Sequence, residues 1–201
     1  MSTLVQIDFP HDTRPLLAEV RQNWRDFYID TSRRSDLYHL HGQTYSIYIC
    51  HGNQKYTPNA CNFPLIDSTI TSLMEEWGGE SFKRAIVYLE PNGEVFPHPD
   101  AGNHYKDKDR FHLVLFGTYD FTVGSITKTL NEGELWWFDN KKVHSVKNLL
   151  EKPRISVIFD VLHGSSWRDK KKTSCNFVKT FDISLECGEA ACNNGIRSSR
   201  F

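Results

Sequence analysis

The stretch FHLVLFGTYDFTVGSITKTLNEGELWWF, residues 111–138, decides the fold that the sequence predicts. It holds four short runs rich in apolar, β-branched and aromatic residues, separated by turns such as Phe116-Gly117 and Glu132-Gly133. Similar apolar runs lie on either side of it in the chain. We therefore expect strands at residues 85–89, 111–116, 119–123, 125–130, 134–138 and 154–161. Short strands at such regular spacing indicate a mainly β sandwich or barrel of the jelly-roll kind.

The chain before residue 84 combines helices with one strand. Thr13 is a plausible N-cap, and Pro15 suits the first turn of a helix that carries an apolar face from Leu16 to Phe27. A second helix is expected from the Asp67-Ser68-Thr69 cap to Gly78-Gly79. Between them, polar and apolar residues alternate over 40–50, as in a half-buried strand.

These elements predict a single domain over residues 1–163. Its β core spans about 84–162, its N-terminal part of helices and strand spans 1–83, and a C-terminal extension follows at 164–201. The extension contains Cys175, Cys187 and Cys192, whose spacing matches no recognised zinc site.

Composition narrows the function classes. The net charge of −1 provides no basic field for nucleic acid or for anionic membranes, and no apolar run approaches the length of a membrane span. Five scattered cysteines do not form a secreted disulfide framework, and the first residues do not begin a signal peptide. We therefore expect a cytoplasmic protein with no membrane partner, and the charge argues against nucleic acid as a partner.

The segment Phe96-Pro97-His98-Pro99-Asp100 carries a candidate metal site. Residues two apart at the end of a strand point to the same side, so His98 and Asp100 can direct a nitrogen and an oxygen at one point. A second histidine, His144, lies downstream, just before another apolar run. Two histidines and one carboxylate form the face that proteins use for non-haem Fe(II), with positions left open for substrate and oxygen.

Two arginines strengthen this interpretation. Arg154 begins the apolar strand 154–161, so its guanidinium is expected to point into the barrel. A buried arginine requires a carboxylate partner, and a dicarboxylate cosubstrate bound bidentately would supply one. Arg110 and His112 are two apart at the start of another strand, so both can face the same pocket.

Several of these segments, taken together, resemble the aspartyl/asparaginyl β-hydroxylase family. The segments that carry the resemblance are Phe96-Pro97-His98, Arg110-Phe111-His112-Leu113, Glu132-Gly133-Glu134-Leu135, Phe138-Asp139, His144 and the strand from Arg154 to Val161. The resemblance covers roughly residues 84–162. It implies a double-stranded β-helix, or jelly roll, and dependence on Fe(II), 2-oxoglutarate and O2.

The resemblance also implies roles for individual residues. His98 and His144 would be iron ligands, Arg154 would pair with the distal carboxylate of 2-oxoglutarate, and Arg110 and His112 would be further cosubstrate contacts. Well-known animal members have glycine at the position of Asp100 and bind iron through two histidines, whereas other members keep the acid. Because this chain has the acid, we expect three ligands.

The reaction implied is hydroxylation of an unactivated C–H bond, with release of succinate and CO2. The substrate would be a free amino acid or an Asp or Asn residue in a peptide. Candidate substrate contacts are Tyr45, Tyr48, His104 and Asp139.

Two other function classes stay open. A non-catalytic jelly-roll module that binds a metal or a ligand is the main alternative. A decayed site, however, would be expected to lose at least one residue of the set His98, Asp100, His144 and Arg154. A cupin-like enzyme that uses iron and oxygen alone is disfavoured by Arg154 and Arg110.

Overall fold

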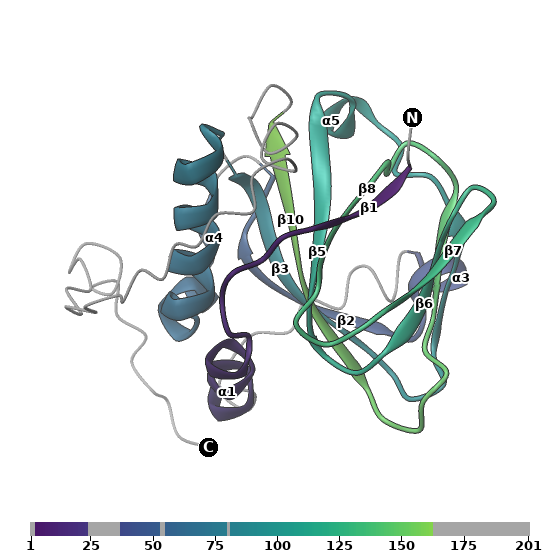
Figure 1. Ribbon diagram of the computed structural model, residues 1–201, viewed down its shortest axis with the longest axis horizontal. Coiled ribbons are helices and arrows are strands. Elements are labelled where there is room, and N and C mark those ends of the chain that lie inside the picture. The colour runs from purple at the N-terminus through teal and green to yellow at the C-terminus, as the bar shows by residue number, and fades with distance from the viewer. Residues whose placement is uncertain (1–2, 24–36, 53–54, 80, 163–201) are drawn as a thin grey trace, which may run out of the picture.

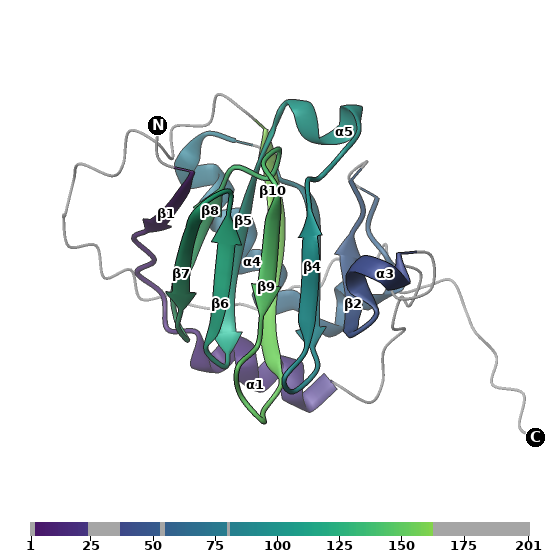
Figure 2. The same ribbon diagram turned by 90° about the vertical axis from the view of Figure 1, so that its right-hand side faces the viewer.

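The computed structural model describes residues 3–23, 37–52, 55–79 and 81–162, and in this region two antiparallel sheets face each other (Figure 1). The larger sheet has six strands. In spatial order these are β1 (Leu4–Ile7), β8 (Leu135–Phe138), β5 (Lys108–Phe116), β10 (Arg154–Leu162), β3 (Ser81–Leu89) and β2 (Thr44–Cys50). The smaller sheet has β4 (Glu94–His98), β9 (His144–Lys147), β6 (Tyr119–Val123) and β7 (Ile126–Leu130), in that order (Figure 2). The predicted jelly roll is confirmed.

The helices lie mainly against the larger sheet. α1 (Arg14–Asn23) and α4 (Pro64–Trp77) cover its outer face, away from the smaller sheet (Figure 1). Three short elements complete the fold: α3 (Tyr38–His41), the 3-10 helix η1 (Pro58–Asn62) and α5 (Asn103–Lys106). None of the helices in these ranges is long and apolar enough to cross a membrane.

Side chains along β5 and β10 alternate between the two faces of the larger sheet. One face packs against the helices, and the other faces the smaller sheet. Phe111, Leu113 and Leu115 of β5 pack toward the helices, as do Val157 and Phe159 of β10. The intervening residues belong to the opposite face of the sheet, because successive side chains of a strand alternate. On β5 these include Arg110, His112 and Val114, and on β10 they are Arg154, Ser156, Ile158 and Asp160. The polar residues at these positions of β5 and β10 therefore face the space between the sheets.

Most predicted elements are present with shifted ends. The helix predicted to start at Asp67 begins at Pro64, whereas its predicted stop is confirmed, because Gly78 caps it with φ +65°, a backbone conformation that glycine adopts readily. The strand predicted over residues 40–50 begins only at Thr44, because residues up to His41 form α3. Strands β1, β4 and β9 were not among the expected strands. Some predicted features lie outside the described residues. They are the end of the first helix with Trp24 and Phe27, residues 53–54, and the extension from 164 onward.

Candidate metal centre

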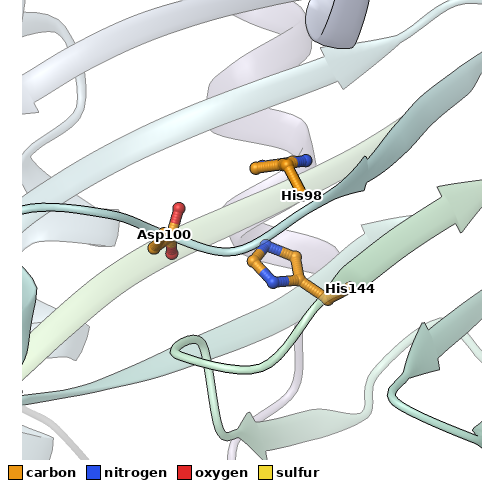
Figure 3. A group of neighbouring side chains, drawn as sticks. All are labelled: His98, Asp100 and His144. Carbon is orange, nitrogen blue, oxygen red and sulfur yellow. The ribbon is translucent and has the colours of Figure 1, made fainter.

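His98 and His144 are brought together by strand pairing. His98 is the last residue of β4 and His144 the first residue of β9, and the two are direct partners in the antiparallel register. Their ring centroids are 4.6 Å apart. Asp100 follows β4 by two residues, and Figure 3 shows its carboxylate beside the two imidazoles. One ligand atom from each of the three residues lies within 4.8 Å of the others.

Both imidazoles are oriented by backbone carbonyl groups. Nδ1 of His98 lies 2.7 Å from the carbonyl oxygen of Phe96, and Nδ1 of His144 lies 3.0 Å from that of Lys142. A carbonyl oxygen only accepts a hydrogen bond, so each histidine carries its proton on Nδ1. Nε2 of each ring then keeps its lone pair for a metal ion, which is the usual arrangement of metal-binding histidines.

The surroundings of His144 keep its imidazole neutral. The ring is buried and lies against Phe138 at 5.0 Å and Phe121 at 6.2 Å between centroids. Burial lowers the pKa of His144 to about 4, and the nearby negative charge of Asp100 offsets this only in part. The imidazole is therefore neutral at neutral pH, with a single N–H, as a metal ligand must be.

The Asp100 carboxylate is held from the side of the larger sheet. Its Oδ2 accepts hydrogen bonds from Nη1 of Arg110 at 2.6 Å and from Nδ2 of Asn140 at 3.0 Å. The backbone N–H of Asp100 also donates to the carbonyl of Asn140 at 2.9 Å.

A cavity adjoins the three residues and encloses about 400 Å³ of space, part of which is open solvent. Its apolar wall is formed by Val87, Val95, Phe121, Phe138, Val146 and Ile158. Its polar wall is formed by His41, Thr44, His98, Asp100, Arg110, His112, His144 and Arg154. The structure thus brings all six predicted metal and cosubstrate residues to one cavity.

Arg154 is among the largest fully buried side chains, with 1% of its surface exposed. Its guanidinium carbon lies 4.5 Å from the centre of the Tyr119 ring, and its Nη1 donates to Oγ of Ser156 at 3.3 Å. Cation–π contact stabilises a desolvated guanidinium on its flat face and leaves N–H groups at its edge for an anion. This arrangement suits a carboxylate that enters the cavity.

Arg110 and His112 occupy different surroundings, although both line the cavity. His112 is packed between the rings of Phe121 and Phe138, at 4.9 and 5.0 Å between centroids. Arg110 donates through Nε and Nη2 to both carboxylate oxygens of Asp160, at 2.6 and 2.8 Å, in addition to its bond to Asp100. Burial disfavours this guanidinium charge, but Asp100 and Asp160 outweigh that effect and hold the pKa of Arg110 well above its usual value.

Three of the four candidate substrate contacts, Tyr45, Tyr48 and Asp139, are not among the residues that line this cavity. Tyr45 packs against Tyr88 at 5.9 Å between centroids, and Tyr48 lies against His51 at 4.9 Å. Asp139 receives a hydrogen bond from the backbone of Lys141. The backbone of His104 lies in α5, but its side chain is outside the described part of the structure.

The structure also places His41 at the cavity, a residue that was not among the predicted site residues. The ring is buried and meets His98 edge to face at 4.7 Å between centroids. The ring reaches this position because α3 lies against β4 (Figure 2). Oγ1 of Thr44 donates to the carbonyl of His41 at 2.8 Å and so holds the end of α3. Asn140 and Asp160 were likewise missed as members of the site, and no local motif marks them.

The donor set fits a divalent iron ion. It consists of the imidazoles of His98 and His144 and the carboxylate of Asp100, at one end of the smaller sheet. This is the donor set of the two-histidine, one-carboxylate facial triad of non-haem Fe(II) proteins. The lowered pKa of His144 keeps its imidazole neutral at neutral pH.

Comparison with protein families supports the same assignment. The model of the aspartyl/asparaginyl beta-hydroxylase family matches residues 6–164. The chain belongs to the aspartyl/asparaginyl β-hydroxylase family. The match starts within β1 and extends past β10, so it takes in the helices as well as both sheets. No curated protein sequence matches this family member significantly.

Solved structures support the fold of this β-hydroxylase family member. A prolyl hydroxylase from Trichoplax adhaerens, bound to a peptide of hypoxia inducible factor, is 12% identical, with a TM-score of 0.58 over 85% of this chain and 88% of its own. The α-ketoglutarate-dependent epimerase SnoN of nogalamycin biosynthesis is 14% identical, with a TM-score of 0.57 over 80% and 78%. A Pseudomonas putida prolyl-4-hydroxylase is 16% identical, with a TM-score of 0.54 over 80% and 92%. At these identities the likeness concerns the fold alone.

Proposed function

We propose that this protein is an Fe(II)- and 2-oxoglutarate-dependent dioxygenase. It hydroxylates an unactivated C–H bond of an amino acid, or of an Asp or Asn residue in a peptide, and releases succinate and CO2. The observation that carries the proposal is the convergence of His98, Asp100 and His144 on a cavity that also contains the buried Arg154. Family membership and the likeness to 2-oxoglutarate-dependent folds agree with it.

In this proposal His98, Asp100 and His144 hold Fe(II). The ion, when bound together with 2-oxoglutarate, supplies the activation of O2 that C–H hydroxylation requires. The chain provides two imidazoles oriented by the carbonyls of Phe96 and Lys142, and a carboxylate fixed by Arg110 and Asn140.

Arg154 selects the cosubstrate. A dicarboxylate can offer one end to the metal and the other to a guanidinium, with which a carboxylate forms two parallel hydrogen bonds. Arg154 reaches the cavity from β10 and is almost fully shielded from water, so this charged contact gains strength from the low local dielectric.

The substrate enters from the more exposed side. His98 and Asp100 are half-buried, and Phe96 on the same strand has 48% of its surface exposed, whereas Arg154 and His144 are buried. This gradient of burial supports a cosubstrate at the inner end of the cavity and a substrate near β4. The exposed ring of Phe96 is the group that we expect it to meet first, before it reaches the buried ring of His41 beside His98.

Anaerobic ligand binding tests the proposal without knowledge of the substrate. 2-Oxoglutarate that chelates Fe(II) gives a visible charge-transfer band, which we expect when it is titrated into the iron-loaded protein in the absence of oxygen. The His144→Ala variant, which lacks a metal ligand, should show no band. A wild-type protein that binds iron without this band would favour the metal-binding module instead.

The substrate class is tested next. The iron- and 2-oxoglutarate-loaded protein is exposed to air with free amino acids, or with short peptides that contain Asp or Asn, and mass spectrometry detects the gain of one oxygen atom. Faster succinate formation with one member of the panel should accompany its hydroxylation. Succinate formed together with an isomerised, unoxygenated product would overturn hydroxylation as the reaction.

A further inference from the structure

A chain of three charged residues leads from the larger sheet to the proposed metal ligand Asp100. Asp160 accepts two parallel hydrogen bonds from Arg110, from Nε at 2.6 Å and from Nη2 at 2.8 Å. Arg110 uses its remaining terminal nitrogen, Nη1, to donate to Asp100 at 2.6 Å. Asp160 has no exposed surface, and Arg110 has 3% exposed.

The two ends of this chain lie on different sheets. Arg110 on β5 and Asp160 on β10 are direct partners in the register of the larger sheet, so their side chains leave the same face side by side. Asp100 follows β4 of the smaller sheet. The ring of Tyr105 covers the guanidinium from another side, with the guanidinium carbon 4.7 Å from the ring centre. Arg110 is therefore a rigid bridge between the sheets.

Charge balance gives Asp160 a role beyond packing. Arg110 paired with Asp100 alone would form a neutral pair and would cancel the negative charge that attracts a cation. Asp160 supplies a second carboxylate, so that the three residues together carry one net negative charge beside the two histidines. A buried arginine left with one partner would also repel a divalent cation, at short range and in a low dielectric.

We propose that Asp160 is a positioning residue, which acts through Arg110 to orient the Asp100 carboxylate and to preserve its negative charge for the metal ion. The inference rests on the proposed function, because it takes Asp100 as a ligand. It assigns Arg110 to the support of that ligand and leaves Arg154 as the cavity arginine that binds the cosubstrate. Outer partners of metal ligands typically change metal affinity by about 10- to 100-fold when they are removed.

Metal affinity in the absence of oxygen and cosubstrate tests the role of Asp160. The dissociation constant for Mn(II) is measured by electron paramagnetic resonance for the wild type and for Asp160→Asn, which keeps the shape but loses the charge. We expect affinity to fall by about 10- to 100-fold in the variant. The matched control is Asp67→Asn, which removes the acid from another ion pair, the partly buried pair with Arg84, remote in sequence from the ligands. Its affinity should stay within about twofold of the wild type, because Asp67 does not contact the site.

A double-mutant cycle separates positioning from a general structural effect. If Asp160 acts through Asp100, the effect of Asp160→Asn should be several-fold smaller in an Asp100→Ala background, where only the uncompensated charge of Arg110 still acts on the ion. An equal loss in both backgrounds would overturn the inference, as would wild-type affinity in Asp160→Asn. Should Asp160→Asn fail to fold by circular dichroism, Arg110→Lys replaces it. Lysine keeps the charge but cannot bridge two carboxylates with a planar fork, so the same loss is expected and wild-type affinity would contradict the inference.

The result also distinguishes this inference from the proposed function. Absence of Mn(II) binding by the wild type would overturn the metal centre itself, and the inference with it. Tight binding by the wild type and an equally tight Asp160→Asn variant would overturn the inference alone.

Discussion

Substitution of Arg154 is the sharpest test of how the cavity selects its cosubstrate. Arg154→Met keeps most of the volume of this fully buried side chain but removes its charge and its donors. Hydrogen bonds to charged groups contribute about 1.5–3 kcal/mol each. Loss of two such bonds to a carboxylate therefore costs at least about 3 kcal/mol, which corresponds to a roughly 100-fold weaker affinity for 2-oxoglutarate. Arg154→Lys keeps the charge without the fork and should lose about tenfold.

The assay compares two dissociation constants for each variant. Anaerobic titration gives the affinity for Fe(II) and then, at saturating Fe(II), the affinity for 2-oxoglutarate. Iron affinity should stay near the wild-type value, because Arg154 contacts Tyr119 and Ser156 rather than the three candidate ligands. Unchanged 2-oxoglutarate affinity, or an equal loss of both affinities, would refute this role for Arg154.

Three further predictions concern pH, metal binding and a turn. In the metal-free protein the pKa of His144 is about 4, below its value near 6.5 in the unfolded chain, so the unfolded state takes up the proton first as pH falls. The free energy of unfolding should therefore decrease between about pH 6.5 and pH 4, by on the order of 3 kcal/mol in all, and urea denaturation of His144→Gln should lack this decrease. Mn(II) at about 100 times its dissociation constant should stabilise the wild type by about 2.7 kcal/mol and should leave His144→Ala unchanged, as thermal melting with and without the metal will show. Gly117 has φ +84°, and a Cβ there would lie 2.9 Å from the carbonyl oxygen of Pro153, whereas Gly124 has φ +60° with nothing within 4 Å. Gly124→Ala should cost about 1 kcal/mol of folding stability for its left-handed backbone, and Gly117→Ala should cost clearly more, so equal urea midpoints for the two variants would contradict the steric argument.

Local patterns were sufficient for the central residues of the site. The two-residue spacing of His98 and Asp100 at a strand end, and of Arg110 and His112 within a strand, fixes their common side whatever the rest of the fold does. Arg154 follows from the same alternation along β10. Period-two alternation is a property of each strand alone, and so it can be read without tertiary information.

What the sequence did not reveal depends on pairing between distant segments. Arg110 and Asp160 are 50 residues apart, and their contact exists because the register of β5 and β10 makes them partners. Asn140 reaches Asp100 across 40 residues, in a contact between the segments that follow β8 and β4. No short motif encodes such contacts, because register is set by turns and by the burial of whole faces.

The missed elements have local causes. Strand β4 contains Pro97, which cannot donate a backbone hydrogen bond, and β9 is only four residues long, so neither shows a clear strand pattern. Around His41, the alternation of polar and apolar residues predicted a strand, but the chain forms a short helix before Thr44. The position of His41 at the cavity therefore could not be predicted.

Oxygen-dependent turnover of 2-oxoglutarate tests the central claim most directly. The protein is loaded with Fe(II) and 2-oxoglutarate without oxygen and then exposed to air, and succinate is quantified for the wild type beside His98→Ala. We predict iron-dependent succinate from the wild type, increased by a substrate from the amino-acid and peptide panel, and none above background from the variant. Equal succinate from both proteins, or none from an iron-loaded wild type with any member of the panel, would contradict the account.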